Sequence, residues 1–429
     1  MPLLARWYDF RDLGNAVARL VDALRNIDAP EGLVYALAAL LGCLGVIGFV
    51  GFTAIVNIWV ERRLIGRIQV RRGPNRVGPF GLLQPVADAI KLIQKEALTP
   101  RAADSMVFTL APIVIFVPAI LSFAVLPWGE RMVLADLNVG VLYLLALGST
   151  TTIIVFMAGY ASNNKYAILG AMRVIAMLIS YEIPSVLALL AVVSFAGTMS
   201  LSGIVAFQDS YWSWLIFFQP LALLIFLLGS TVELNRSPAD IAEAESEIIA
   251  GYHIEYSGMK WGLFYAVELV NAVAVSGIIA AVFLGGWWTF GLEEFVPGWL
   301  LFIAKLYAVY FLLVWLRGTL PRFRIDQLMA FAWKFLLPLS LVNLVLVALE
   351  VTVWAEYEIS AGIVLPIFAL VNVALTGVLV VGWARVMARQ YERFPRRPRL
   401  LSEIDVPLPV SGEQREARPD GRASARAAV

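Results

Sequence analysis

Closely spaced carboxylates are the feature of this sequence most suited to chemistry. The stretch VELNRSPADIAEAESE, residues 232–247, carries Glu233, Asp240, Glu243, Glu245 and Glu247. The whole chain is 60% hydrophobic and only 15% charged, so this gathering of negative charge stands out. Titratable groups that lie close together beside apolar surroundings can exchange protons or set a local field. The plainer interpretation is a solvated helix face, because acids favour helix N-termini.

The same stretch predicts how its acids are held. Ser237-Pro238-Ala239-Asp240 has the pattern of a helix start, with Ser at the N-cap and Pro at the first helical position. Gly251 suits the residue that follows a helix end. At about 3.6 residues per turn, Asp240, Glu243 and Glu247 fall within about 60° of one another. We therefore expect a helix that presents three acids on one face.

Further acids lie within or beside apolar segments. Glu182 follows Tyr181 in a long apolar run, Glu268 lies about two turns into another, and Glu255 lies between Glu268 and the acidic stretch. A charged side chain at a bilayer centre costs about 2.5–3.5 kcal/mol, so it usually has a buried partner or a function. These acids predict a proton relay that leads inward from the acidic stretch. The alternative is a static salt bridge between helices.

Long apolar segments predict the fold class, an all-α polytopic membrane protein with amphipathic surface helices. A bilayer span needs about 20 mostly apolar residues. The mean hydropathy of the chain is +0.79, well above that of ordinary soluble proteins. We expect about nine transmembrane helices, at residues 34–60, 106–128, 138–160, 166–196, 211–232, 261–286, 297–316, 335–355 and 360–384.

Composition divides the chain into three parts. Residues 1–32 predict an N-terminal amphipathic arm, because charges interrupt them and apolar positions recur at helical spacing; they do not resemble a signal peptide. Residues 33–385 form the transmembrane domain. Residues 386–429 are rich in Arg, Pro, Ala, Ser and Glu and predict a disordered cytoplasmic tail.

Basic residues indicate the orientation in the membrane. They gather in the connections 61–105 and 317–334 and in the tail, whereas 197–210, 287–296 and 356–359 have none. The positive-inside rule then places 61–105, 233–260 and 317–334 in the cytoplasm, with the N-terminus outside and the C-terminus cytoplasmic.

The connection 61–105 is long enough to suggest a function. Gly-Pro pairs at Gly73-Pro74 and Gly78-Pro79 predict turns. After Pro85, apolar and charged residues alternate at helical spacing, which predicts an in-plane helix at the membrane surface. Ordered connections of this length between spans are usually functional. An ordinary basic interfacial loop is the alternative.

Scarce ligand residues limit the redox chemistry of this chain. It has one cysteine, Cys43, and one histidine, His253. Iron–sulfur clusters need several thiolates, and haem or zinc needs His or Cys ligands. We therefore expect no redox centre or metal site on the chain itself.

Three segments together resemble one family. They are ERRLIGRIQVRRGPNRVGPFGLLQPVADAIKL, ELNRSPADIAEAESEIIAGYHIEYSGMKWGLF and PRFRIDQLMAFAWKFLLPLSLVN. They are similar to the quinone-site membrane subunit of respiratory complex I, which is the H subunit of bacterial NADH:quinone oxidoreductase and subunit 1 of the mitochondrial enzyme. The resemblance covers roughly residues 33–385. It implies a subunit of a proton-translocating enzyme in the bacterial inner membrane.

The resemblance also implies roles for particular residues. The cytoplasmic loops would form the floor and entrance of a quinone chamber, and acids leading into the membrane would conduct protons. The first-loop motif near the chamber is matched by Glu61, Arg62, Gln69, Arg71, Gly73, Pro74, Asn75 and Arg76. The proton-relay motif is matched by Tyr181, Glu182, Glu233, Asp240, Glu243, Glu245, Glu247, Glu255 and Glu268.

Cofactors and partners follow from the same resemblance. The substrate would be ubiquinone or menaquinone, while FMN, NADH and the iron–sulfur clusters would belong to partner subunits. The partners would be the quinone-binding and terminal iron–sulfur peripheral subunits, neighbouring membrane-arm subunits and the lipid bilayer, with no nucleic acid.

The chain departs from the family pattern at Ala239, at Ile241-Ala242 and at Ala330, where the family usually has Phe, Leu-Pro, and Arg or Lys. Two rival functions stay open on the sequence: the membrane anchor of an ion-pumping hydrogenase or formate hydrogenlyase, and a free-standing ion-coupled transporter. A transporter would be expected to show internal repeats, and none is evident.

Overall fold

All regular structure in the described residues is helical. The computed structural model describes residues 30–393 except 131, 211–212, 241–250, 293–294 and 358–359. Eight of its helical segments are long and apolar enough to cross a membrane, which confirms the all-α polytopic fold. They are Glu31–Ile68 (α2), Ser105–Ala124 (α4, α5 and η4), Gly140–Ala161 (α6), Lys165–Ala196 (α7), Gly258–Phe283 (α12), Gly298–Thr319 (α13), Ile325–Tyr357 (α14, η7 and α15) and Gly362–Leu379 within α16.

The fifth expected span, at 211–232, is shorter than predicted and broken. Its described part consists of α9 (Leu215–Phe218) and α10 (Pro220–Glu233), separated at Gln219. Proline disfavours helical backbone in the residue before it, and Gln219 has φ −131° and ψ 52°. The apolar run therefore supplies a helix of 14 residues instead of a full span.

Capping side chains and a glycine set the ends of helices α4 and α7. Asp104 caps α4 by accepting from the backbone N–H groups of Met106 and Val107. Asn164 caps α7 by accepting from the Tyr166 N–H at 3.0 Å. The α7 helix ends at Gly197, whose φ of 68° lies in the left-handed region that glycine adopts without strain. Asn164 and Gly197 therefore set the two ends of α7.

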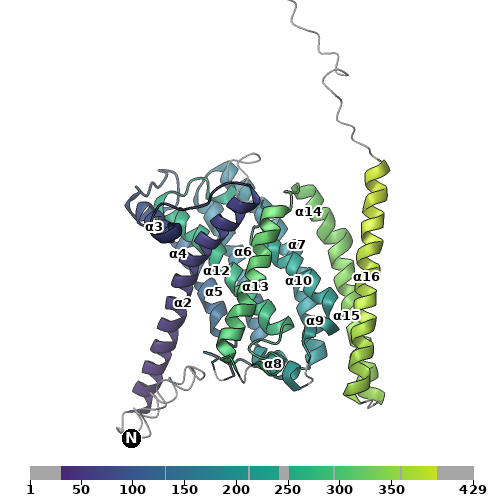
Figure 1. Ribbon diagram of the computed structural model, residues 1–429. Helices are drawn as coiled ribbons and strands as arrows, with labels where there is room; N and C mark the ends of the chain where they lie inside the picture. The colour runs from purple at the N-terminus through teal and green to yellow at the C-terminus, as the bar shows by residue number, and fades with distance from the viewer. Residues whose placement is uncertain are drawn as a thin grey trace, which may run out of the picture. The chain divides into compact units, whose positions relative to one another are not determined.

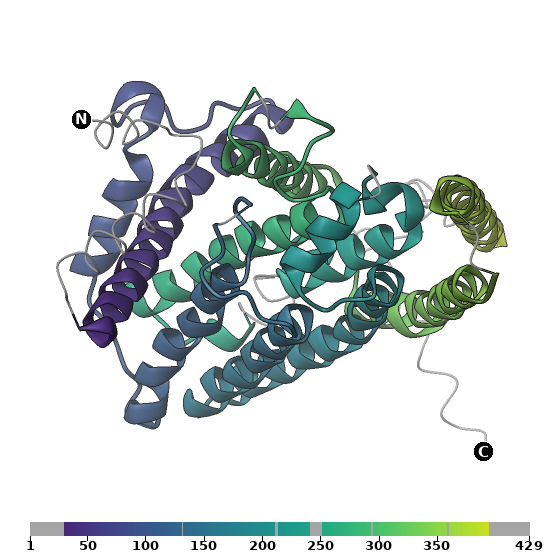
Figure 2. The same cartoon turned by 90° about the horizontal axis from the view of Figure 1, so that it is seen from below.

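Helix α7 is the central element of the bundle. It packs against α6, α10 and α15, and also contacts α14, η7 and η5 (Gly251–His253). One face of α7 presents small residues that allow close approach; Gly170, for example, lies against the backbone of Gly251. Figure 1 shows α7 beside α6 and α10, and Figure 2 shows the helices of the bundle from below. The buried face of α7 therefore lies against other helices, whereas residues such as Ile179 and Ile183 are exposed.

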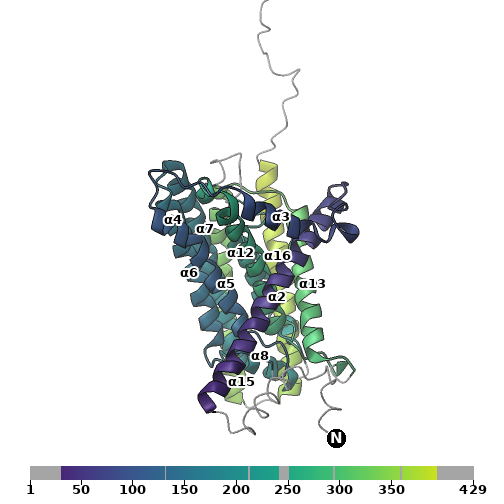
Figure 3. The same cartoon turned by 90° about the vertical axis from the view of Figure 1, so that its left-hand side faces the viewer.

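Helix α2 lies at the margin of the same bundle. Only 12% of its most apolar window is buried, and it contacts α12 and α13. In Figure 3 it runs obliquely across the face formed by these helices. Its buried polar residues, Thr53, Asn57 and Glu61, recur every four positions and so form one inward stripe.

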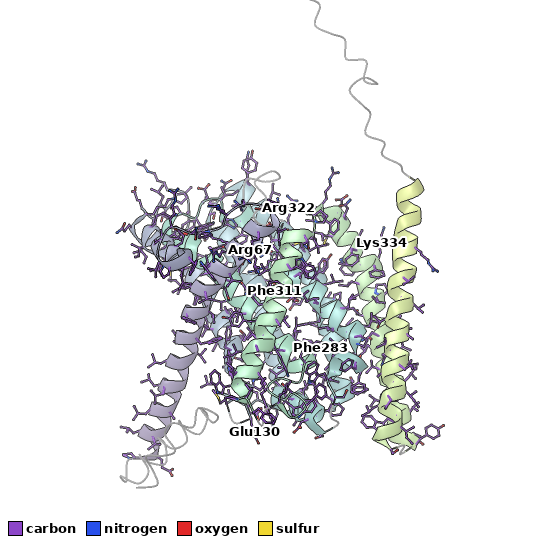
Figure 4. The ribbon with its side chains drawn as sticks, in the orientation of Figure 1. Arg67, Glu130, Phe283, Phe311, Arg322 and Lys334 are labelled. Atoms are coloured by element: carbon purple, nitrogen blue, oxygen red, sulfur yellow. The ribbon has the colours of Figure 1, made fainter. Side chains whose placement is uncertain are left out.

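The connections that carry the predicted site gather at one end. Figure 1 shows α3 (Gln84–Gln94) and α14 (Ile325–Phe331) at this end, and α8 (Leu201–Ser210) at the opposite one. Figure 4 likewise places Arg67 and Arg322 at one end and Glu130 at the other. The basic connections therefore share one side, as the sequence predicts.

The chain divides into two units, Met1–Thr376 and Gly377–Val429. All packing described here lies in the first. Helix α16 (Ala361–Arg393) begins in the first unit, and its later residues belong to the second.

The local predictions have mixed outcomes. The surface helix after Pro85 is confirmed as α3, with Pro85 in its first turn. The helix start at Pro238 is wrong for residues 238–240, which are not helical. The Pro238 carbonyl accepts from the Phe323 N–H at 3.0 Å, so a tertiary contact replaces the first helical turn. Residues 1–29 of the N-terminal arm, residues 394–429 of the tail and the face of Glu243 and Glu247 lie outside the described residues. Residues 386–393, predicted as the start of a disordered tail, are instead helical and continue α16.

Candidate functional site

A cavity of about 120 Å³ inside the helical bundle contains two of the predicted relay acids. Glu182 on α7 and Glu233 at the end of α10 both line it. Other polar groups line it as well, namely Ser122, Thr151, Thr152, Ser185 and Asn271. A cavity needs roughly 10–15 Å³ for each water molecule that it holds, and each water needs two to four polar partners. The cavity therefore has room for several waters between two carboxyl groups.

A serine hydroxyl lies beside each acid. The Ser149 hydroxyl on α6 donates to Glu182 Oε1. The Ser185 hydroxyl on α7 lines the cavity beside Glu233. Ser149 is exposed on the side of the bundle, and Glu182 is half-buried. The sequence did not single out either serine, because a serine in a membrane helix usually bonds only to its own backbone.

The other predicted relay residues that the structure describes do not line this cavity. The Tyr181 hydroxyl donates to the Leu328 carbonyl of α14 at 2.9 Å, so its side chain is fixed against another helix. Glu268 on α12 is half-buried and is not part of the cavity lining, although Asn271, almost one turn further along α12, is. Glu255 accepts from the Asn164 side chain at 2.7 Å. The structure thus brings Glu182 and Glu233 together and leaves Glu255 and Glu268 outside the lining.

Glu61 forms a second polar centre, between α2, α13 and the turn after α10. Arg236 donates to Glu61 Oε2 at 3.1 Å, Tyr310 donates to the same oxygen at 3.3 Å, and Arg317 donates to Oε1. The side chains of Glu61 and Arg236 are only 4% and 3% exposed. Burial lowers the pKa of Arg236, but the adjacent Glu61 carboxylate more than offsets this and raises it. Arg236 therefore remains a cation inside the protein.

The exposed residues of the first-loop motif form a folded surface beside this centre. Arg62 donates to Asp88 of α3 at 2.6 Å, and Gln84 also bonds to Asp88. Burial raises the pKa of Asp88, but the hydrogen bonds from Arg62 and Gln84 and the nearby charges lower it overall. Gln69 caps the end of α2.

The rest of the motif is held by close backbone packing. A side chain on Gly73 would approach the Arg62 carbonyl to 3.1 Å, so the turn folds back onto α2. Gly73 and Pro74 are half-buried, whereas Arg71, Asn75 and Arg76 are exposed. The loop is therefore fixed at its base and presents guanidinium groups outward.

The acidic stretch is joined to the loop that follows α13. Arg322 donates to Asp240 Oδ2 at 2.8 Å, next to the backbone bond between Phe323 and Pro238. Glu243, Glu245 and Glu247 lie outside the described residues. No local pattern indicates the Asp240–Arg322 pair, because its members are 82 positions apart.

His253 lies close to this pair and predicts an acid sensitivity. The imidazole is buried and packs edge-on against Tyr252 at 4.9 Å. Burial lowers the pKa of His253 to about 4, although the Asp240 carboxylate opposes this. The ordinary value is about 6.5. The folded form thus resists a proton that the unfolded form accepts, so stability should fall as the pH drops from 6.5 towards 4.

At pH 5.5 this group should cost on the order of 1 kcal/mol relative to pH 7.5. Thermal unfolding of the purified complex at both pH values measures the loss. A His253→Phe variant keeps the ring packing and should show a smaller difference. An equal difference in the two proteins would rule out His253 as the source.

Within the described ranges, no group of three or more His, Cys, Asp or Glu side chains is arranged to hold a metal ion. The carboxylates instead bond to hydroxyls, amides and guanidinium groups.

Comparison with known proteins identifies the family. The family model described as NADH dehydrogenase matches residues 41–348. The H subunit of NADH-quinone oxidoreductase from Dehalococcoides mccartyi strain CBDB1 is 54% identical over 301 residues, which cover 70% of this chain and 83% of that protein. The corresponding H subunit of Geobacillus kaustophilus is 52% identical over 292 residues, or 68% of this chain and 87% of that protein.

A third relative agrees. The H subunit of NADH-quinone oxidoreductase from Bacillus mycoides is 49% identical over 293 residues, which cover 68% of this chain and 87% of that protein. These names favour a respiratory oxidoreductase over a hydrogenase-type anchor or a free-standing transporter. The chain belongs to the NADH dehydrogenase family and, within it, to the H subunits of NADH-quinone oxidoreductase, which are membrane subunits of bacterial complex I.

Proposed function

We propose that this subunit forms the floor and entrance of the quinone chamber and links quinone reduction to proton translocation through its buried acids. The observation that carries this proposal is the cavity shared by Glu182 and Glu233. Two carboxyl groups and several hydroxyls around a space for water are what a proton path inside a membrane requires.

The end of the bundle that carries the basic connections supports the quinone side of the proposal. Arg71 and Arg76 are exposed there, and Arg62 is fixed by Asp88. A quinone gains negative charge as electrons reach it, and guanidinium groups nearby stabilise that charge. The subunit provides no redox centre in this proposal, so FMN, NADH and the iron–sulfur clusters lie on partner subunits.

The side of the bundle supports a membrane-arm partner. Ser149 and Glu182 are hydrogen bonded to each other, and Ser149 is exposed on the outer side of a membrane-spanning helix. Such a pair is costly against lipid and is normally covered by protein. A neighbouring membrane-arm subunit would cover it, while the quinone-binding and terminal iron–sulfur peripheral subunits would sit on the basic end.

The orientation is part of the proposal. The N-terminal end of α2 lies opposite the basic connections in Figure 1. With those connections in the cytoplasm, as the positive-inside rule requires, the chain would begin outside the bacterial inner membrane.

Two amide substitutions test the proton path. Glu182→Gln and Glu233→Gln keep the shape of each side chain but remove its titration. In the assembled complex each should reduce quinone-linked proton pumping by roughly tenfold or more. Electron transfer from NADH to an artificial acceptor should be unchanged, because it does not use this subunit.

The control is Glu130→Gln, an exposed acid at the opposite end of the bundle (Figure 4). It should pump like the wild type. Wild-type pumping in both Glu182→Gln and Glu233→Gln would refute the proposed path.

A further inference from the structure

The Ser185 hydroxyl lies at the contact between the two helices that carry the cavity acids. Ser185 is on α7, is 1% exposed and lines the cavity with Glu182 and Glu233. Its hydroxyl donates to the Tyr181 carbonyl at 2.9 Å and faces the Glu233 carboxyl in the lining of the same cavity. A single hydroxyl proton therefore has two competing acceptors, one on each helix.

The choice of acceptor depends on where the Glu233 proton is. When Glu233 is ionised, it can only accept, so the Ser185 hydroxyl donates to it. When Glu233 is protonated, it can donate to Ser185 Oγ, and the Ser185 hydroxyl then donates to the Tyr181 carbonyl. That carbonyl belongs to the peptide group whose nitrogen is that of Glu182. The hydroxyl thus changes partner as the acid gains or loses its proton.

The opposite helix leaves space for this hydroxyl. A Cβ atom built on Gly229 of α10 would lie 2.0 Å from Ser185 Oγ, which is impossible without displacement. The same atom would lie 3.4 Å from Ser185 Cβ and from the Tyr181 carbonyl oxygen, both ordinary contacts. Among the described residues, the hydroxyl itself is therefore the only severe obstacle to a side chain at Gly229.

We infer that Ser185 is a positioning residue for the proton path, that its hydroxyl orients the Glu233 carboxyl in the cavity, and that Gly229 is needed to accommodate it. This inference rests on the proposed function. Ser185 does not itself carry a net proton; it determines which way Glu233 points and which form of Glu233 is favoured.

The first test is Ser185→Ala in the assembled complex. A hydrogen bond to a charged group influences an equilibrium by on the order of tenfold or more. Protons pumped per NADH oxidised should therefore fall at least about twofold in inverted membrane vesicles, with the artificial-acceptor rate unchanged. The matched control is Ser194→Ala, on the same helix, because Ser194 makes the same 2.9 Å bond to a backbone carbonyl away from the cavity.

The second test is a double-mutant cycle. Gly229→Ala should lower the pumping ratio as Ser185→Ala does, because its methyl group displaces the hydroxyl. In a Ser185→Ala background it should cause no further loss, because the remaining contacts are ordinary. Gly45→Ala, at a glycine of α2 with open space around it, controls for adding a methyl group to a membrane helix.

Infrared difference spectroscopy measures the carboxyl C=O stretching frequency, which reports the hydrogen bonding of Glu233 and not a general packing defect. The carboxyl C=O band that is lost in Glu233→Gln should shift in Ser185→Ala and Gly229→Ala, and should stay in place in Ser194→Ala. Wild-type pumping ratios and an unshifted band in both variants, with pumping lost in Glu233→Gln, would overturn this inference alone. Unimpaired pumping in Glu233→Gln would overturn it together with the proposed path.

Discussion

Replacing Glu61 by Gln should destabilise the folded subunit by about 3–5 kcal/mol, because it removes the negative charge shared by two guanidinium groups inside the protein. Arg236 is 3% exposed and Arg317 only 19% exposed, so water cannot take the place of that charge. The Gln amide would also turn an N–H group towards one of the cations. Thermal unfolding of the purified complex, and the yield of assembled complex from membranes, measure the effect.

Two further variants separate charge from contact at this position. Glu31→Gln makes the same substitution at the exposed start of α2 and should be neutral. Glu61→Asp keeps the charge on a shorter side chain and should lose less stability than Glu61→Gln. Full assembly and an unchanged melting temperature in Glu61→Gln would show that the Arg236 cation does not depend on the carboxylate.

The sequence predicted the membrane helices well because their signal is local. A bilayer demands a minimum apolar length, and each long apolar run meets it by itself. Glu182 was identifiable for the same reason, since a charge inside such a run is costly. The break at Gln219 was missed because a hydropathy count does not register the backbone conflict before Pro220.

Local sequence patterns could not predict which site residues pair with one another. Glu61 and Arg236 are 175 positions apart, and the sequence around either residue does not identify the other as its partner. The start of the acidic stretch was predicted as a helix because Ser237-Pro238 has a strong local preference. In the structure, the Pro238 carbonyl and the Asp240 carboxylate bond to the loop after α13 instead. Tertiary contacts here outweigh a preference worth only about 1 kcal/mol.

The role of Gly229 also could not be predicted from the sequence. A glycine in a membrane helix is common, and most serve close helix packing. Only the position of Ser185 on the neighbouring helix shows that this one leaves room for a hydroxyl. The reason lies in a contact between α7 and α10, and neither helix reveals it alone.

Replacing Gly81 by Ala should unfold the first loop locally and abolish quinone reduction. Gly81 has a φ of 78°, and a Cβ atom there would lie 2.4 Å from the carbonyl carbon and oxygen of Pro74 and 2.7 Å from the Asn75 nitrogen. These are backbone atoms, so no side-chain rotation relieves the clash. Left-handed strain and overpacking each cost about 1–3 kcal/mol.

The damage should spread to the neighbouring contacts. Trp59 donates to the Phe80 carbonyl at 3.1 Å, and the Arg63 guanidinium lies 5.8 Å from the Phe80 ring. Both hold the loop against α2 and depend on the turn that Gly81 completes. Trypsin should therefore cleave the variant faster at Arg71, Arg72 and Arg76, while the helices of the bundle stay protected.

Comparing this variant with Glu233→Gln separates the two halves of the proposed function. Gly81→Ala should stop quinone reduction itself, because the basic loop surface is lost. Glu233→Gln should impair proton pumping with the loop still folded and resistant to trypsin. Gly45→Ala, which adds a methyl group in open space, should behave like the wild type in both assays. If Gly81→Ala loses its trypsin resistance and still reduces quinone at the wild-type rate, the first-loop surface is not part of the quinone chamber.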